Sequence, residues 1–148
     1  MIPDFRADGT LPPGVHVADD WEEIVRVFGR TPQRRSLLRR LHAGLENLRD
    51  AGCPWVLLDG SFTATKPNPA DVDGCWKYVA QIDEGVLDEA FWLEDFVLDR
   101  RSLRIRFGMD FFIGDAIEAG SGKPFAEFFQ TDRDGKPKGI VRLDLNRL

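Results

Sequence analysis

The chain has 148 residues, of which 43% are apolar and 11% aromatic, and its 20 basic and 25 acidic side chains leave a formal net charge of −5. This composition is typical of one compact globular domain and excludes an intrinsically disordered chain. The apolar runs are far shorter than the roughly 20 residues of a membrane span. The two cysteines, Cys53 and Cys75, have the spacing neither of a disulfide framework nor of a CxxC metal-ligand pair. We therefore expect a cytoplasmic protein without a membrane segment, whose excess of acid argues against nucleic-acid binding by the surface as a whole.

Charge is unevenly distributed along the chain. Residues 52–103 contain ten acidic and four basic side chains, and a basic run from Arg34 to Arg40 precedes them. This run has two interpretations: it lies on a solvated helix face, or it binds RNA or a phosphorylated partner. Because no repeat or long Gly/Ser linker divides the sequence, residues 1–148 are expected to form a single domain.

The N-terminal segment predicts an extended arm followed by a short helix. Residues 1–18 show little periodicity and contain Pro12-Pro13-Gly14, which indicates an arm laid on the body of the domain. The first helix is expected over residues 21–28, with Asp19 or Asp20 as its N-cap.

A second helix and a strand follow. Thr31 can cap the helix, Pro32 suits its first turn and Gly52 suits its end. Leucines recur at helical spacing between these limits and predict a buried stripe: Leu37, Leu38, Leu41, Leu45 and Leu48. The continuously apolar residues 54–58 predict a strand covered on both faces, which ends in a sharp turn at Asp59-Gly60-Ser61.

The second half predicts short strands alternating with helices. We expect a strand over residues 72–78, an acidic helix over 83–93, one bent strand or two over 104–107 and 109–113 with a bulge at Gly108, a short helix over 124–130, a turn at 132–135 and a final strand over 140–145. This order favours an α/β (α+β) fold with a small mixed sheet flanked by helices.

The residues that indicate chemistry lie between the first predicted strand and the middle of the chain. Gly60-Ser61 places backbone N–H groups and a hydroxyl at a turn, which is what a phosphate group needs. Asp71 and Asp73 are one residue apart, so on a strand both carboxylates point to the same face. The two carboxylates repel each other unless a cation such as Mg²⁺ lies between them. Asp110, with apolar neighbours on both sides, is either buried and paired or directed into a site.

These residues resemble a known family. Gly60-Ser61, a nine-residue gap, Asp71-Val72-Asp73 and a later strand carboxylate are similar to the polymerase-beta-type nucleotidyltransferase superfamily, in particular its minimal single-domain members from bacterial toxin-antitoxin and defence systems. The sequence resembles most closely an uncharacterised bacterial and phage-borne branch, over nearly its whole length. The motifs that carry this likeness are Leu11-Pro12-Pro13-Gly14, Leu58-Asp59-Gly60-Ser61-Phe62, Asp71-Val72-Asp73-Gly74-Cys75-Trp76, Met109-Asp110-Phe111-Phe112, Glu118-Ala119-Gly120-Ser121-Gly122 and Phe128-Phe129-Gln130.

The resemblance implies an activity and a set of site residues. In the superfamily, three carboxylates hold two Mg²⁺ ions and the Gly-Ser turn holds the phosphates of a nucleoside triphosphate (NTP). The implied metal-binding and catalytic residues are Asp71, Asp73 and Asp110, and the implied nucleotide-binding residues are Gly60 and Ser61. The implied reaction is transfer of a nucleotidyl group to a hydroxyl of a protein, a tRNA or a small molecule, and the family's toxin-antitoxin members suggest a helical partner protein.

Other features of the sequence leave alternatives open. Lys66 lies in the loop between the turn and the carboxylates, where it either meets a triphosphate or is a solvated loop lysine. Trp76, beside the acids, is a candidate for stacking on a base. Gly74-Cys75 stands where the superfamily usually has a bulky apolar residue and predicts a bend in the strand. The base must be bound by the arm, the basic helix or the C-terminal third, because no second nucleotide-binding domain follows.

A second function, from a different class, also fits these residues. The chain would then keep the fold without the activity, as a nucleotide-binding or partner-binding module such as an antitoxin.

Overall fold

The computed structural model of the chain describes residues 1–91 and 101–148. Its strands form one mixed five-stranded sheet in the order β1-β5-β2-β3-β4. The strands are β1 (Gly14–Val17), β2 (Trp55–Asp59), β3 (Val72–Trp76), β4 (Met109–Ile113) and β5 (Gly139–Asp144). β2 is antiparallel to both β3 and β5, whereas β1 is parallel to β5 and β3 is parallel to β4. The predicted α/β (α+β) class with a small mixed sheet is confirmed.

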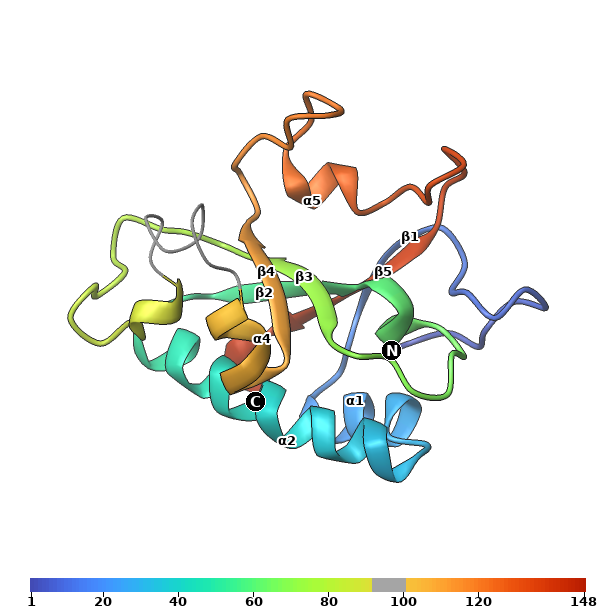
Figure 1. Ribbon diagram of the computed structural model, residues 1–148, viewed down its shortest axis with the longest axis horizontal. Helices are drawn as coiled ribbons and strands as arrows, with labels where there is room; N and C mark the ends of the chain where they lie inside the picture. Colours follow the sequence, from blue (N-terminus) through green and yellow to red (C-terminus); the bar gives the residue numbers. More distant parts are fainter. Residues whose placement is uncertain (92–100) are drawn as a thin grey trace.

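Helices cover both faces of the sheet. The helices are α1 (Trp21–Phe28), α2 (Pro32–Asp50), α4 (Arg101–Phe107) and α5 (Phe125–Phe128). Figure 1 shows α1, α2 and α4 on one side of the sheet and α5 on the other. The larger apolar core lies on the α2 side, and a smaller cluster lies under α5, made of Leu57, Cys75, Phe125, Phe129 and Ile140. Within residues 1–91 and 101–148, no helix is long and apolar enough to cross a membrane.

The two N-terminal helices begin and end where capping chemistry predicts. The Asp20 side chain accepts a hydrogen bond from the backbone N–H of Glu23 at 2.9 Å, and Thr31 Oγ1 accepts one from Arg34 at 3.1 Å. Gly52 follows α2 with a φ of 103°, a conformation that glycine adopts without strain. The five leucines of the predicted stripe are all buried against the sheet.

Two predictions about the middle of the chain are wrong. Residues 104–107 belong to helix α4, not to a strand, and Gly108 ends this helix instead of forming a bulge. Its φ is 63° and its N–H donates to the carbonyl oxygen of Arg104 at 2.9 Å, as in a helix-terminating glycine. The alternation of charged and apolar residues indicated a strand, but Leu103 and Phe107, four residues apart, are the side chains that pack inward, while Ile105 is 73% exposed.

The predicted helix over 83–93 is absent from its described part. Residues 83–91 form turns and a short 3₁₀ helix, Glu89–Phe91, and residues 92 and 93 lie outside the described residues. The Asp83 and Asp88 side chains each accept a hydrogen bond from the backbone two residues on, at 2.9 Å. Such local bonds compete with helix formation, and Gly85 weakens it further.

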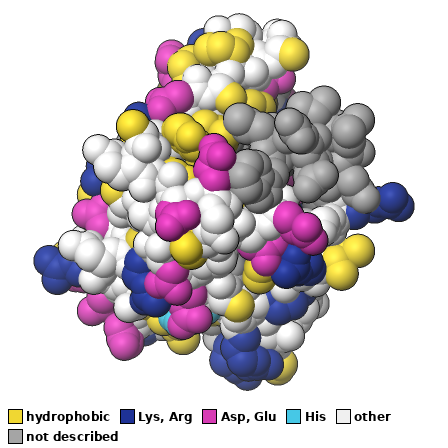
Figure 2. All heavy atoms as spheres, turned by 90° about the vertical axis from the view of Figure 1, so that its left-hand side faces the viewer, with side chains coloured by type: hydrophobic (Ala, Val, Ile, Leu, Met, Phe, Trp, Pro, Cys, Tyr) yellow, Lys and Arg dark blue, Asp and Glu magenta, His cyan; other side chains and the backbone are white. Residues whose placement is uncertain are grey.

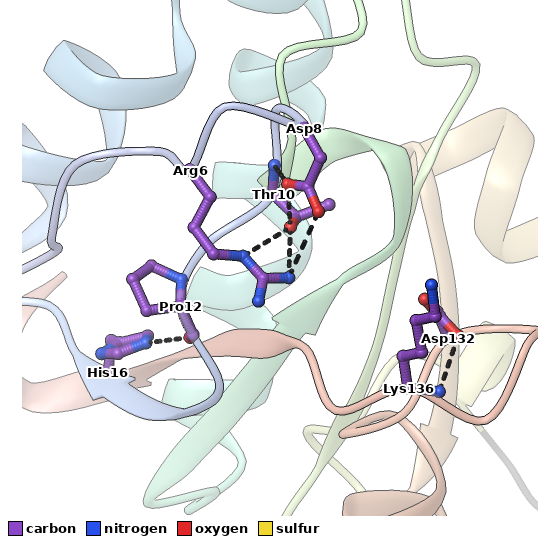
Figure 3. Close-up of polar contacts among 7 residues, drawn as sticks. All are labelled: Arg6, Asp8, Thr10, Pro12, His16, Asp132 and Lys136. Carbon is purple, nitrogen blue, oxygen red and sulfur yellow. Dashed lines mark hydrogen bonds and ion pairs between the residues drawn. The ribbon is translucent and has the colours of Figure 1, made fainter.

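The remaining elements differ from prediction mainly in length. β3 ends at Trp76 instead of residue 78, and α5 spans four residues instead of seven. The turn at residues 132–135 is present: Asp132 Oδ1 accepts from the backbone N–H groups of Asp134 and Lys136, both at 2.9 Å. Figure 3 shows the second of these contacts.

The N-terminal 18 residues run along the edge of the sheet and contribute β1. Arg6, Asp8 and Thr10 hydrogen-bond one another in the turn that precedes it, and the His16 ring contacts the carbonyl oxygen of Pro12 at 2.6 Å (Figure 3). Gly9 in this segment accepts a hydrogen bond from the N–H of Thr65 at 2.9 Å. The arm therefore braces the loop that follows β2.

Charged side chains of both signs are interspersed on the face of the molecule that Figure 2 shows. The separation of acidic and basic blocks along the sequence is therefore not preserved as separate surfaces on this face.

Gly74 keeps β3 straight instead of bending it, as its ladder continues in register with both β2 and β4. A Cβ atom there would collide with the carbonyl oxygen of Leu57 and lie 2.8 Å from the Phe111 ring. We expect Gly74→Ala to lower the free energy of unfolding by about 1–3 kcal/mol, the usual cost of overpacking a core. Urea denaturation measures this effect. Gly85→Ala is the control, because its Cβ would approach only the end of the Asp83 side chain, and equal effects of the two substitutions would contradict the prediction.

Candidate functional site

A row of carboxylates crosses three neighbouring strands on the α5 side of the sheet. Asp59 of β2 is the register partner of Asp73 of β3, which is the register partner of Asp110 of β4. Because side chains alternate between faces of a strand, these three share the face that also carries Leu57 and Cys75 beneath α5. The row is thus placed by strand pairing, between residues that lie up to 51 positions apart in the sequence.

The three carboxylates singled out from the sequence lie together. One oxygen each of Asp71, Asp73 and Asp110 lies within 4.8 Å of the others, and all three residues are partly buried. Asp71 joins the group because it lies two residues before Asp73, immediately ahead of β3. Carboxylate oxygens at this spacing are suitable ligands for a hard divalent cation such as Mg²⁺.

The electrostatics of the site favour a cation there. The pKa of Asp73 is raised to about 7, mainly by burial and in addition by the charges of Asp71, Asp110 and Asp59, against an opposing contribution from Lys138. Like charges held close together disfavour ionisation of any one of them. A bound cation would relieve this repulsion.

Asp59, at the β2 end of the carboxylate row, forms an ion pair with Lys138. The Asp59 side chain is 2% exposed, and its Oδ1 lies 3.0 Å from Lys138 Nζ. Burial raises the pKa of Asp59, while the nearby Lys138 charge and hydrogen bond oppose that rise. The pair joins the end of β2 to the segment that leads into β5.

The turn after β2 brings backbone close to the carboxylates. Gly60 has a φ of 78°, and a Cβ at this position would collide with the Asp73 carboxylate. Only glycine allows this approach. Ser61 follows in the 3₁₀ helix Gly60–Thr63, where Thr63 Oγ1 donates to the carbonyl oxygen of Gly60 at 3.2 Å.

Arg34 lies under this turn, fully buried, and therefore belongs neither to a solvated helix face nor to an RNA-binding surface. Its guanidinium donates to carbonyl oxygens at 2.6 to 3.2 Å, those of Phe28, Ser61, Phe62, Ala64 and Lys66. Burial, together with a smaller effect of the Arg30 charge, lowers the pKa of Arg34 to about 10, so Arg34 stays protonated at neutral pH. Arg35 and Arg39, from the same basic run, are exposed.

A cleft of about 630 Å³ opens beside these groups. Of the residues predicted from the sequence, Gly60, Ser61, Lys66, Asp73 and Asp110 line it, and Asp71 lies in the same carboxylate group. The rest of the lining is Asp59 and residues largely from the C-terminal third: Phe112, Phe128, Phe129, Thr131, Asp132, Arg133 and Lys138. The C-terminal third, and not the basic helix, completes the site.

Two aromatic residues at the cleft replace the one suggested by the sequence. Trp76 is 1% exposed in the core on the α2 side, so its ring is not available to a ligand. Phe112 and Phe128 line the cleft and are partly exposed. In the sequence, Phe112 and Phe128 stand out only within the motifs Met109-Asp110-Phe111-Phe112 and Phe128-Phe129-Gln130, and no local signal marks Lys138 or Arg133.

Comparison with known proteins identifies one family. A family model described as "Family of unknown function (DUF6932)" matches residues 3–144. The chain has no match among the curated proteins or the solved structures.

Proposed function

The chain belongs to this family of unknown function, and we propose that it is a Mg²⁺-dependent nucleotidyltransferase that transfers a nucleoside monophosphate from an NTP to a hydroxyl group. The acceptor hydroxyl belongs to a protein, a tRNA or a small molecule, in a toxin-antitoxin or defence setting. One observation carries the proposal: the oxygens of Asp71, Asp73 and Asp110 lie within 4.8 Å of one another in a site whose cleft is also lined by the Gly60-Ser61 turn.

The residues present fit Mg²⁺ and a polyphosphate. Asp71, Asp73 and Asp110 would hold two Mg²⁺ ions, which when bound would acidify the acceptor hydroxyl and stabilise negative charge on the leaving pyrophosphate. Lys66, Arg133 and Lys138 line the same cleft and supply positive charge for the phosphates. Ser61 and the backbone N–H groups of its turn supply hydrogen-bond donors.

In the proposed reaction the chain orients both reactants. The turn at Gly60-Ser61 binds the β- and γ-phosphates, which leaves the α-phosphorus near the carboxylates. The acceptor oxygen attacks this phosphorus, the bond to the bridging oxygen breaks, and pyrophosphate leaves. Asp110 orients the acceptor hydroxyl and accepts its proton. The contribution of the protein is mainly positioning and charge stabilisation.

The test is a labelling experiment. The protein is incubated with each α-labelled NTP, Mg²⁺ and total cell extract, and we expect label to be transferred to an acceptor with at least one NTP. The double variant Asp71→Asn with Asp73→Asn should abolish this transfer. Asp50→Asn, at the exposed end of α2, should leave it unchanged.

A negative result has a defined meaning. If none of the four NTPs gives labelling and calorimetric titration with Mg²⁺-NTP shows no heat, the catalytic proposal is wrong. The non-catalytic, partner-binding module then becomes the better description.

A further inference from the structure

Part of the lining of the cleft, beside the carboxylate row, is aromatic. Phe112 lies two residues after Asp110 on β4, so it shares the α5 face of the sheet with the carboxylates. The rings of Phe112 and Phe125 stack with centroids 3.9 Å apart and an interplanar angle of 17°. Phe125 and Phe129 of this group are buried, whereas Phe128 is partly exposed and lines the cleft.

Phe128 is held in place by its neighbours. Its ring centroid lies 6.2 Å from that of Phe125, in a T-shaped arrangement, and 5.5 Å from that of Phe129. These contacts belong to the apolar cluster that fixes α5 on the sheet. A ring held this way loses little conformational entropy when a flat ligand packs against it.

The polar side chains next to this aromatic lining are engaged in holding the following loop. Thr131 Oγ1 donates to the carbonyl oxygen of Phe128 at 3.3 Å, and Gln130 Nε2 donates to that of Ala126 at 3.1 Å. Asp132 Oδ1 accepts the two backbone hydrogen bonds of the 132–135 turn. At this end of the cleft a ligand therefore meets the rings of Phe112 and Phe128, with Arg133 beside them.

The other end of the cleft is charged. It combines the carboxylates of Asp73 and Asp110 with the turn at Gly60-Ser61, and Lys66 and Lys138 lie along the same lining. A ligand that satisfies both ends carries a polyphosphate, with its metal ions, and a flat apolar ring system. A nucleoside triphosphate has this distribution of charge and aromatic surface.

We propose that the wall formed by Phe128 and Phe112 is the nucleobase subsite of the cleft, and that it binds the base by stacking. This inference rests on the proposed function, because the proposed function is the reason for assuming that the ligand carries a polyphosphate. Stacking tolerates any base, since every base has a π-face. Recognition by stacking at Phe128 accordingly predicts binding of all four NTPs, with the larger purine rings favoured.

The test compares ligands with and without a base. Calorimetry measures the affinity of the protein for Mg²⁺-ATP and for Mg²⁺-tripolyphosphate, which keeps the phosphates and lacks the nucleoside. We expect ATP to bind about tenfold more tightly, in line with the energy of base stacking on an aromatic side chain. Phe128→Ala should remove this difference while leaving the affinity for tripolyphosphate unchanged.

Two further variants separate loss of the ring from loss of structure. Phe128→Leu keeps apolar volume without a stacking surface and should also remove the difference in affinity between ATP and tripolyphosphate. It tests the proposal even if Phe128→Ala does not fold. Tyr78→Ala removes an exposed aromatic ring from outside the cleft lining and should behave like wild type. Thermal unfolding checks that each variant is folded.

The outcomes distinguish the subsite from the proposed function. Equal affinities for ATP and tripolyphosphate in the wild type, or an unchanged difference in Phe128→Leu, would overturn the subsite and leave the nucleotidyltransferase proposal intact. If neither ligand binds, both proposals are wrong.

Discussion

Asp73→Asn is expected to abolish nucleotidyl transfer and, in the absence of metal, to make the protein more stable. Transfer should fall by about 10³-fold or more, because several kcal/mol of transition-state stabilisation depend on the metal that this carboxylate would hold. Stability should rise because burial, and next the charges of Asp71, Asp110 and Asp59, oppose the ionisation of Asp73. A residue that costs stability and supports catalysis is typical of a functional site.

The pH dependence of this gain follows from the pKa of Asp73. Its value of about 7 in the folded protein lies above the ordinary value of 3.8, mainly because of burial. In metal-free protein the cost of ionising Asp73 is absent below about pH 4, grows as the pH rises, and is complete above pH 7. The stability advantage of Asp73→Asn over wild type should follow the same course. Several acids share the repulsion, so replacing one of them removes only part of it. We therefore expect Asp73→Asn to be more stable than wild type at pH 8 by about 2 kcal/mol, or roughly 4–8 °C in Tm.

Thermal unfolding in EDTA between pH 4 and pH 8.5 measures the difference in stability between Asp73→Asn and wild type. Adding Mg²⁺ should narrow or reverse this difference, because Mg²⁺ should stabilise the wild type alone. Asp134→Asn, in the exposed turn before β5, is the matched control and should give a curve parallel to that of wild type. Parallel curves for wild type and Asp73→Asn across the whole range would contradict the prediction. So would equal stabilisation of both by Mg²⁺.

Local chemistry accounts for the elements that could be predicted from the sequence. The caps at Asp20 and Thr31 and the leucine stripe of α2 are signals within one helix, so no knowledge of the rest of the fold was needed. The spacing of Asp71 and Asp73 is likewise a local signal, since two residues one apart on a strand share a face. Helix α4 shows the limit of such signals, because its alternating charges fit a strand as well as an exposed helix surface.

The remaining features of the site depend on contacts between distant segments. Lys138 meets Asp59 only because β5 and β2 are neighbours, and Phe128 lines the same cleft as Asp73 and Asp110 only because α5 packs on their face of the sheet. Arg34 looked like part of a solvated basic run, and the one signal against that reading was its place in the first turn of α2. There its side chain reaches the loop after β2, which lies about 30 residues further along the chain. Pair contacts of this kind leave no trace in composition or periodicity.

Arg34→Lys is expected to lower the free energy of unfolding by about 3 kcal/mol, although the charge is retained. The planar guanidinium of Arg34 reaches Phe28, Ser61, Phe62, Ala64 and Lys66. A lysine has three donors on a single nitrogen and leaves several of these carbonyl oxygens without a partner. Each buried polar group left unpaired costs about 1–3 kcal/mol.

The effect should be concentrated in the turn that lines the cleft. In Arg34→Lys, the backbone amides of residues 60–66 should exchange with deuterium faster than in wild type. The amides of β5 should change less and remain more protected than those of residues 60–66. Urea denaturation gives the global change, and Arg39→Lys, an exposed position one turn further along α2, should change it by less than about 0.5 kcal/mol. If Arg34→Lys matches Arg39→Lys in both measurements, then the buried guanidinium does not hold this turn. If it behaves as expected, the turn at Gly60-Ser61 owes its conformation to a residue of α2, and the geometry that we propose binds phosphate is set by the packing of the core beneath it.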